Sequence, residues 1–258
     1  MKKTGLTLTT IAALLAGVFT FTACDKDDAK IRVGSYNILH GAQVDLQMSI
    51  IANDIVSHNL DIVGLQEIDQ KTDRVKKLDT MKALSEASGY PHYAFTRAID
   101  FQGGEYGTGI LSRYPIVSFE VIPLDSENYE QRALGHAVIE IHGKRVDFFN
   151  THLSYENDEV RAKQFETLRD RTAGCKTFLL TGDFNTSDTN EFKVISNSSL
   201  VNRNTYSTFP ESQSSIDNIV YSSDFTLADS GMGPAGHSDH NMLWAELKWT
   251  PVRKNEKR

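Results

Sequence analysis

Five places in the chain, the last of them a pair of segments, put carboxylate, amide or imidazole side chains at the end of an apolar run, where they could bind a cation or move a proton. The first two are SYNILHG and LQEID, which carry Asn37 and Glu67. Burying a carboxylate is costly unless a metal ion or a proton donor compensates it. Mg²⁺ takes oxygen ligands and keeps several waters, so one carboxylate and one amide can hold it. These two segments predict a divalent-cation site, and a surface glutamate is the alternative reading of Glu67.

The third and fourth segments are FFNTHLSY, which carries His152, and TGDFNT, which carries Asp183 and Asn185. Asp183 and Asn185 are two positions apart, so their side chains share a face if the chain there is extended. Turns in which an Asp or Asn side chain bonds to its own backbone are the alternative for both segments.

The fifth place consists of SSIDNIVYS and GHSDHNML, which supply Asp217, Asp239 and His240. Neighbouring side chains of an extended strand point to opposite sides, so Asp239 could hold a metal while His240 faces the substrate. General-base catalysis requires a histidine whose other ring nitrogen is held by a carboxylate. The pair therefore predicts a histidine base with an aspartate partner.

Apolar periodicity predicts that strand, helix and strand follow one another twice, with polar residues at the strand ends of each unit. Ligands of α/β folds bind at strand ends, so we expect the two units to bring Asn37, Glu67, His152 and Asp183 to one site. The units comprise strands 31–39 and 61–68 around a helix at 44–58, and strands 145–153 and 177–181 around a helix at 158–172.

The other expected elements are mostly strands. Many strands with few helices favour an α/β fold with two packed sheets over a single doubly wound sheet. These elements are strands 93–99, 107–113, 117–124, 133–141, 215–221, 225–229 and 242–248, a helix at 75–87 and a short helix near Glu191.

The motifs at these five places, in this order, resemble the motifs of the endonuclease/exonuclease/phosphatase superfamily. The resemblance covers about residues 30–250. It implies a four-layer α/β sandwich of the deoxyribonuclease I type, with two packed central sheets and the site where their strand ends meet. It also implies metal-dependent hydrolysis of a phosphoester.

For the metal, the resemblance implies that Glu67 is the principal Mg²⁺ ligand, with Asn37 beside it and Asp239 completing the environment. Mn²⁺ and Ca²⁺ are alternative ions. We therefore expect a hydrolase that needs a divalent cation.

For the chemistry, it implies that His240 takes a proton from the attacking water and that Asp217 orients His240. Asp183 would position the water, while Asn185 and His152 hold the phosphoryl oxygens. Attack in line with the leaving oxygen then builds charge on the equatorial oxygens, which these donors stabilise.

Two further residues carry expectations with open alternatives. Glu105, in GGEYGTGILSR, is expected to orient His152, and the alternative is a glutamate in a glycine-rich loop that faces water. Arg132, in EQRALGHAV, resembles the phosphate-contacting arginine of the family, and the alternative is an exposed ion pair.

The chain divides into four parts. Residues 1–23, with Lys2 and Lys3 before an uncharged run, read as a lipoprotein signal peptide, and Cys24 directly follows small residues, as in a lipidation box. A non-lipidated signal peptide or a membrane anchor is the alternative. An acidic tether (24–29), the catalytic domain (30–250) and a charged tail (251–258) follow, and Cys175 has no partner once Cys24 is lipidated. We expect a monomer outside the cytoplasm, anchored to a bacterial outer membrane and in one reading exposed at the surface.

Loss of residues 1–23 changes the formal charge from −7 to −9, which is unlike a protein that neutralises nucleic-acid phosphates. We expect a hydrolase of a phosphorylated small molecule or lipid. A secreted nuclease is the second hypothesis, and a catalytically inactive surface-binding module is the third. Specificity is expected in the loops around the site, at residues 69–73, 101–106, 126–131 and 155–158.

Overall fold

A computed structural model of the protein describes residues 30–250. The expected signal peptide, the lipidation site Cys24, the tether and the tail at 251–258 lie outside the described residues.

The described chain forms two six-stranded sheets. The first has the order β11 (Phe225–Met232), β12 (Leu243–Trp249), β1 (Lys30–Asn37), β2 (Ile62–Gln70), β4 (Gly104–Ser112) and β3 (His92–Phe101). The second has the order β5 (Ile116–Pro123), β6 (Ala133–Ile141), β7 (Lys144–His152), β8 (Phe178–Asp183), β10 (Asp217–Ser222) and β9 (Ser198–Leu200).

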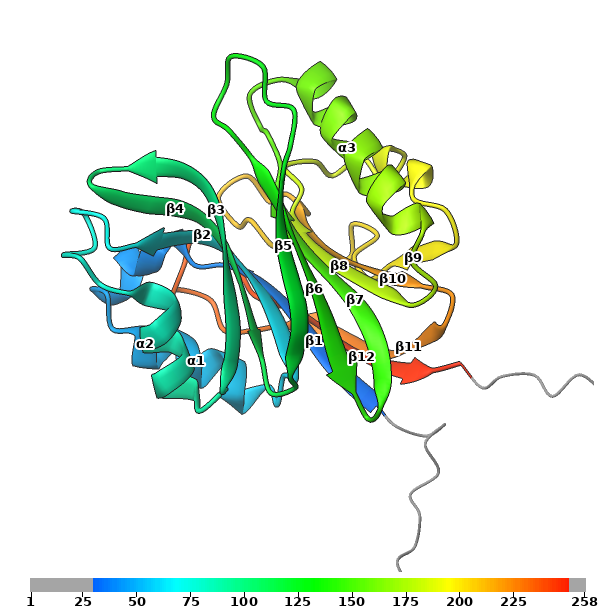
Figure 1. Ribbon diagram of the computed structural model, residues 1–258, viewed down its shortest axis with the longest axis horizontal. Helices are drawn as coiled ribbons and strands as arrows, with labels where there is room; N and C mark the ends of the chain where they lie inside the picture. The colour runs from blue at the N-terminus through cyan, green and yellow to red at the C-terminus, as the bar shows by residue number, and fades with distance from the viewer. Residues whose placement is uncertain (1–29, 251–258) are drawn as a thin grey trace, which may run out of the picture.

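Three apolar clusters join these sheets and the helices into four layers (Figure 1). The first cluster lies between the sheets and includes Val33 and Phe148. The second packs α1 (Met48–Ser57) and α2 (Thr80–Ser88) on the outer face of the first sheet, and the third packs α3 (Asp158–Ala173) on the second. The expected α/β sandwich with two packed central sheets is confirmed.

Both strand–helix–strand units are present as parallel strand pairs. Strands β1 and β2 pair in parallel on either side of α1 in the sequence, and β7 and β8 do so on either side of α3. Parallel strands end at the same edge of a sheet, so each pair presents its last residues together. Within residues 30–250, no helix is both long and apolar enough to cross a membrane.

The first two predicted helices differ from the observed ones in where they begin. The helix predicted at 44–58 begins only at Met48, as α1, because the 3₁₀ helix η1 (Leu39–Val44) ends at Val44 and a turn follows it. Asp45 and Leu46, both with positive φ, separate the two. The second predicted helix starts at Thr80 instead of residue 75, because Asp79 caps it by accepting a hydrogen bond from the Lys82 amide. A second 3₁₀ helix, η2 (Glu191–Val194), lies where a short helix was expected, whereas the short strand β9 was missed.

Candidate active site

Asn37 links the ends of the two sheets. It is the last residue of β1, and its Nδ2 donates hydrogen bonds to Glu67 Oε1 of the first sheet and to Asp183 Oδ2 of the second, both at 3.1 Å. His152 lies opposite Asp183 in the parallel β7–β8 register. The two strand–helix–strand units thus deliver their four polar residues to one place.

Glu67 leaves the regular ladder of β2 at a bulge. The pairing of β2 with β4 shifts between Leu65 and Ile68, and Glu67 has the positive φ of 56°. A bulge of this kind redirects a side chain out of the strand's alternation. Burial raises the pKa of Glu67, but His40, His152, Asn37 and His240 outweigh it and lower the pKa to about 2. The carboxylate is therefore ionised and held at the rim of the site.

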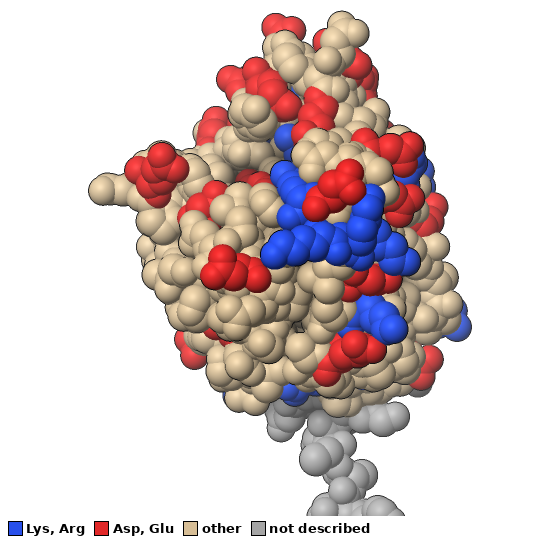
Figure 2. All heavy atoms as spheres, turned by 90° about the vertical axis from the view of Figure 1, so that its left-hand side faces the viewer, with Lys and Arg blue, Asp and Glu red and all other residues tan. Residues whose placement is uncertain are grey.

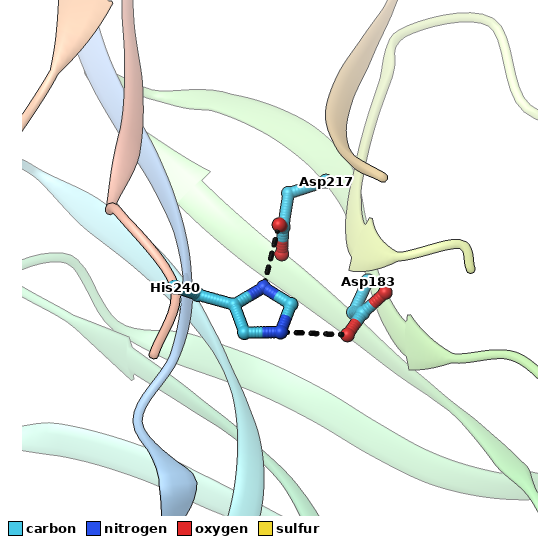
Figure 3. Close-up of side chains that lie close together, drawn as sticks. All are labelled: Asp183, Asp217 and His240. Carbon is cyan, nitrogen blue, oxygen red and sulfur yellow. Dashed lines mark hydrogen bonds and ion pairs between the residues drawn. The ribbon is translucent and has the colours of Figure 1, made fainter. Parts of the chain in front are cut away.

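A histidine with a carboxylate on each ring nitrogen forms the centre of the site (Figure 3). His240 Nδ1 lies 2.8 Å from Asp217 Oδ2, and Nε2 lies 3.6 Å from Asp183 Oδ2. Burial lowers the pKa of His240, but Asp217 first, then Asp183 and Asp239, raise it to about 10. The two carboxylates can keep His240 protonated. The contact with Asp217 also fixes the orientation of the ring, so that a proton can be transferred at Nε2.

Asp183 is the group around which the other polar side chains gather. Besides Asn37 and His240, its Oδ2 lies 3.5 Å from His152 Nε2, and its Oδ1 accepts a hydrogen bond from the Asn185 amide at 3.1 Å. Burial, and then the Asp217 carboxylate, raise the pKa of Asp183. Asp183 can therefore accept or share a proton with the groups around it.

The two histidines beside Asp183 differ in charge. Burial and the nearby Arg132 guanidinium lower the pKa of His152 to about 3, so His152 is neutral where His240 is protonated. A neutral imidazole offers one donor and one acceptor, which suits contact with an uncharged or partly protonated oxygen.

Asn185 and Asp239 flank this cluster. Asn185 has a φ of 52°, and its Nδ2 donates to the Leu153 carbonyl at 2.8 Å, so its side chain is fixed beside Asp183. Ser238 Oγ donates its proton to the Asn37 carbonyl oxygen at 2.8 Å and lies 3.1 Å from Asp239 Oδ1. Ser238 thereby ties the Asp239 loop to the end of β1.

Two groups of side chains could hold a cation. Glu67, Asn37 and Asp239 offer oxygen donors of the type that Mg²⁺ prefers; the Asn37 side chain contacts Glu67, and Ser238 ties the Asn37 backbone to the loop that carries Asp239. Asp183, Asp217 and His240 have ligand atoms within 4.8 Å of one another. The contact of 2.8 Å between His240 Nδ1 and Asp217 Oδ2 commits that nitrogen to a hydrogen bond, which suits the second group to proton transfer at Nε2. We call the first group the oxygen-donor set and the second the proton-transfer group.

Arg132 lies near His152 but is enclosed by acids. Only 4% of it is exposed, its Nη1 lies 2.9 Å from Glu130 Oε1, and its Nη2 lies 3.7 Å from Glu156 Oε1. Its Nε has no hydrogen-bond partner among the described residues. The alternative of an exposed ion pair is wrong, since this ion-paired guanidinium is buried beside the site.

Glu105 does not take the position that was expected for it. The strand β4 starts at Gly104, so Glu105 is a paired residue between Gln70 and Asp100 and not part of a loop. Its Oε1 lies 3.2 Å from Arg97 Nε, and its side chain is half-exposed. Arg97 competes for this carboxylate, and the structure gives Glu105 this partner in place of His152.

Three polar residues near the site were not singled out from the sequence. His237 Nδ1 lies 2.9 Å from Asp54 Oδ2, and Asp54 also accepts a hydrogen bond from the Tyr36 hydroxyl at 3.4 Å. This contact braces the loop that carries Asp239 and His240 against α1. Arg74, in the loop after β2, lies at the edge of a pocket beside Glu67. His40 Nδ1 lies 4.0 Å from Glu67 Oε2.

Comparison with known proteins identifies the family of the chain. The family model described as "Endonuclease/Exonuclease/phosphatase family" matches residues 34–240. In a comparison with curated protein sequences, none matches the chain significantly.

Three solved structures illustrate the shared fold. An endonuclease/exonuclease/phosphatase from Beutenbergia cavernae DSM 12333 is 21% identical, with a TM-score of 0.75 over 85% of this chain and 72% of that one. A family protein from Bacteroides thetaiotaomicron is 22% identical, with a TM-score of 0.69 over 87% and 99%. The mannosyl-6-phosphatase of Bacteroides thetaiotaomicron VPI-5482 is 21% identical, with a TM-score of 0.65 over 85% and 100%. The chain belongs to the endonuclease/exonuclease/phosphatase family, whose members are hydrolases that act on phosphoester bonds.

Proposed function

We propose that the protein is a Mg²⁺-dependent hydrolase that cleaves a phosphoester in a small phosphorylated molecule or a lipid. The observation that carries the proposal is the position of Asn37, which hydrogen bonds both Glu67 of the oxygen-donor set and Asp183 of the proton-transfer group. A cation bound at Glu67 would then lie next to the proton-transfer group, as attack by water on a phosphoryl group requires.

The residues of the chain divide the chemistry between them. Asp217 holds His240 through Nδ1, which leaves Nε2 to take a proton from the attacking water once His240 is neutral. Asp183, beside Nε2, positions that water, and His152 and Asn185 contact the phosphoryl oxygens. A Mg²⁺ held by Glu67, Asn37 and Asp239 would supply positive charge to the same oxygens.

Charge and similarity favour a small substrate over nucleic acid. The formal charge of −7 gives no general attraction to a polyanion. One structural neighbour is described as a mannosyl-6-phosphatase, which acts on a small phosphorylated molecule. A secreted nuclease with the same chemistry is the second candidate, because the site itself does not exclude a nucleic-acid phosphodiester.

The test is hydrolysis of p-nitrophenyl phosphate, bis-p-nitrophenyl phosphate, phosphatidic acid, sphingomyelin and plasmid DNA by purified protein, with Mg²⁺, Mn²⁺, Ca²⁺ or EDTA. We expect metal-dependent release of phosphate or alcohol that is lost in His240→Ala. Asp229→Asn, an exposed change on β11, is the matched control. Activity that persists in EDTA or in His240→Ala contradicts the mechanism, and cleavage of plasmid alone selects the nuclease.

We also propose that the enzyme works outside the cytoplasm, attached through a lipid on Cys24. The basic start of the chain, the uncharged run and the cysteine after small residues support this. Radiolabelled palmitate should enter the wild-type protein in a bacterial host and fail to enter Cys24→Ser. Equal labelling of both proteins would refute the anchor.

A further inference from the structure

A pocket of about 90 Å³ opens directly beside Glu67. It is lined by Glu67, Arg74, Ile99, Phe101, Tyr106 and Glu130, and we call it the Arg74 pocket. Its walls come from the bulge of β2, the loop after β2, the β3–β4 hairpin and the loop before β6. Glu67, which lines the pocket, is also an expected metal ligand. The part of a substrate that enters the pocket would therefore lie next to the phosphoryl group at the metal.

Arg74 is held rigidly in this wall. Its Nε and Nη2 each lie 2.7 Å from an oxygen of Asp69, which is fully buried. The guanidinium carbon lies 4.7 Å from the centre of the Phe101 ring and 5.4 Å from that of Tyr106. A bidentate pair on the Nε–Nη2 edge leaves Nη1 directed away from Asp69, so the residue keeps donor capacity for another acceptor.

The loop that carries Arg74 is fastened to the neighbouring hairpin. The Arg74 amide donates to Gln102 Oε1 at 3.2 Å, and Lys77 Nζ donates to the Gly103 carbonyl at 3.1 Å. The pocket is therefore organised before a substrate arrives, which reduces the entropy lost on binding.

The lining fits a neutral group rich in hydroxyls. Arg74 donates hydrogen bonds, the Glu130 carboxylate accepts them, and the rings of Phe101 and Tyr106 offer apolar surface to carbon atoms between hydroxyls. Arg74 and Glu130 already pair with Asp69 and Arg132, but an acyl chain would offer no hydrogen bond to their remaining donor and acceptor atoms and would remove water from them, which is unfavourable. A second phosphate would meet two carboxylates, Glu67 and Glu130. At roughly 30 Å³ per water molecule, the volume accepts one edge of a ring with its hydroxyls.

Several of the basic side chains near the pocket are already paired with acids. Figure 2 shows the side of the molecule on which β2, β3 and β4 lie in Figure 1, and Lys and Arg side chains gather there among acidic ones. Lys71 pairs with Asp79 at 3.5 Å, Lys77 with Asp73 at 2.7 Å, and Arg97 with Asp100 at 2.5 Å. Ion pairs that are already satisfied leave little charge to neutralise phosphates along a strand.

We propose that the Arg74 pocket binds the alcohol part of the substrate and that this part is a neutral, hydroxyl-rich ring such as a sugar. The inference rests on the proposed phosphoester hydrolysis and names its substrate class as sugar phosphates. Arg74 is then the residue that selects the substrate through a substrate hydroxyl.

The test compares kcat/KM of the full chain with Mg²⁺ for glucose 6-phosphate, mannose 6-phosphate, p-nitrophenyl phosphate and phosphatidic acid. Arg74→Gln and Glu130→Gln should each lower the ratio of kcat/KM for the better hexose phosphate to that for p-nitrophenyl phosphate by roughly 10-fold, because a hydrogen bond to a charged group is lost. Ile99→Trp fills the pocket without touching Asp69, so it should lower the same ratio even where Arg74→Gln does not fold. Arg97→Gln, on the same hairpin but outside the pocket, should leave the ratio unchanged.

The outcomes separate this inference from the proposed function. Absence of metal-dependent cleavage of every substrate overturns the function. If p-nitrophenyl phosphate is cleaved but Arg74→Gln and Ile99→Trp do not change the ratio of kcat/KM for the hexose phosphate to that for p-nitrophenyl phosphate, the role of the Arg74 pocket is overturned and the proposed function stands. Preference for phosphatidic acid over both hexose phosphates overturns the substrate class. Saturation-transfer NMR of free mannose and glucose, with wild type and Ile99→Trp, measures occupancy without turnover, and equal signals from both proteins also overturn the pocket.

Discussion

Gln66 and Asn150 join the two sheets directly beneath the active site. The Gln66 side-chain amide donates to Asn150 Oδ1 at 2.7 Å, and Asn150 Nδ2 donates to the Leu65 and Gly109 carbonyls at 2.9 and 2.8 Å. Gln66 precedes Glu67, and Asn150 lies two residues before His152. These hydrogen bonds between the sheets therefore set the position of Glu67 relative to His152. They can form only because the two sheets approach closely here.

Gly64→Ala should destabilise the protein by about 1–3 kcal/mol, because there is no room for a methyl group between the sheets. A Cβ on Gly64 would meet Thr181 Oγ1 and Asn150 Oδ1 closer than van der Waals contact allows. Urea unfolding followed by tryptophan fluorescence measures the change. Gly174→Ala is the control, since Gly174 has a φ of −84° and nothing lies within 4 Å of its would-be Cβ. Equal stability of the two variants would show that the interface is not tightly packed.

Asp217→Asn should lower kcat roughly 10²–10⁴-fold and move the acid limb of the pH profile to lower pH. The Asp217 carboxylate is the largest influence that raises the pKa of His240, and His240 must be neutral to accept a proton. We therefore expect wild-type kcat/KM to increase with pH through neutrality and up to about pH 10, and that of Asp217→Asn to level off at lower pH. Initial rates from pH 5 to 10 at constant ionic strength and saturating Mg²⁺ test this. An acid limb at the same pH in Asp217→Asn and wild type would contradict the role of Asp217.

The extent to which the sequence predicted this site follows from how local each signal is. Asn37, His152 and Asp183 end their strands, and Glu67 lies at the bulge of β2. The apolar runs of these strands and the helices between them are visible in the sequence, so the convergence of the four residues could be predicted. The contact between Asp54 and His237 joins residues 183 positions apart and leaves no local pattern.

The surroundings of Glu105 and Arg132 depend on which charged side chains compete to pair with them. Glu105 and Arg132 were assigned by similarity of their motifs, but Arg97 takes Glu105, and Glu130 and Glu156 enclose Arg132. Such choices depend on which charged groups the fold places within a few ångströms. Three lining residues of the Arg74 pocket lie in segments where specificity was expected: Phe101 and Tyr106 in 101–106, and Glu130 in 126–131. Arg74 itself lies one residue beyond the segment 69–73.

Glu67→Gln should remove most of the thermal stabilisation that Mg²⁺ gives to the protein. An ion that binds only the folded state raises stability by RT ln(1 + [L]/Kd), which is about 2.7 kcal/mol at a hundredfold excess over Kd. Differential scanning fluorimetry in EDTA and across a Mg²⁺ titration measures the shift in Tm without any substrate. Glu105→Gln is the matched control, because Glu105 pairs with Arg97 outside the oxygen-donor set. The same Mg²⁺-induced shift in Glu67→Gln and wild type would place the cation elsewhere, with the Asp183, Asp217 and His240 group as the next candidate.

His152→Gln should make the metal-free protein less sensitive to acid. Burial lowers the folded-state pKa of His152 from 6.5 to about 3, so between these values the unfolded state binds the extra proton and the free energy of unfolding falls as pH decreases. His152 alone lowers the free energy of unfolding of the wild-type protein by on the order of 3 kcal/mol between pH 7 and pH 4. Urea unfolding in EDTA across that range compares wild type, His152→Gln and His92→Gln, the last at the start of β3 outside the site. Only His152→Gln should flatten the dependence on pH, and parallel curves for all three proteins would show that His152 is not held neutral.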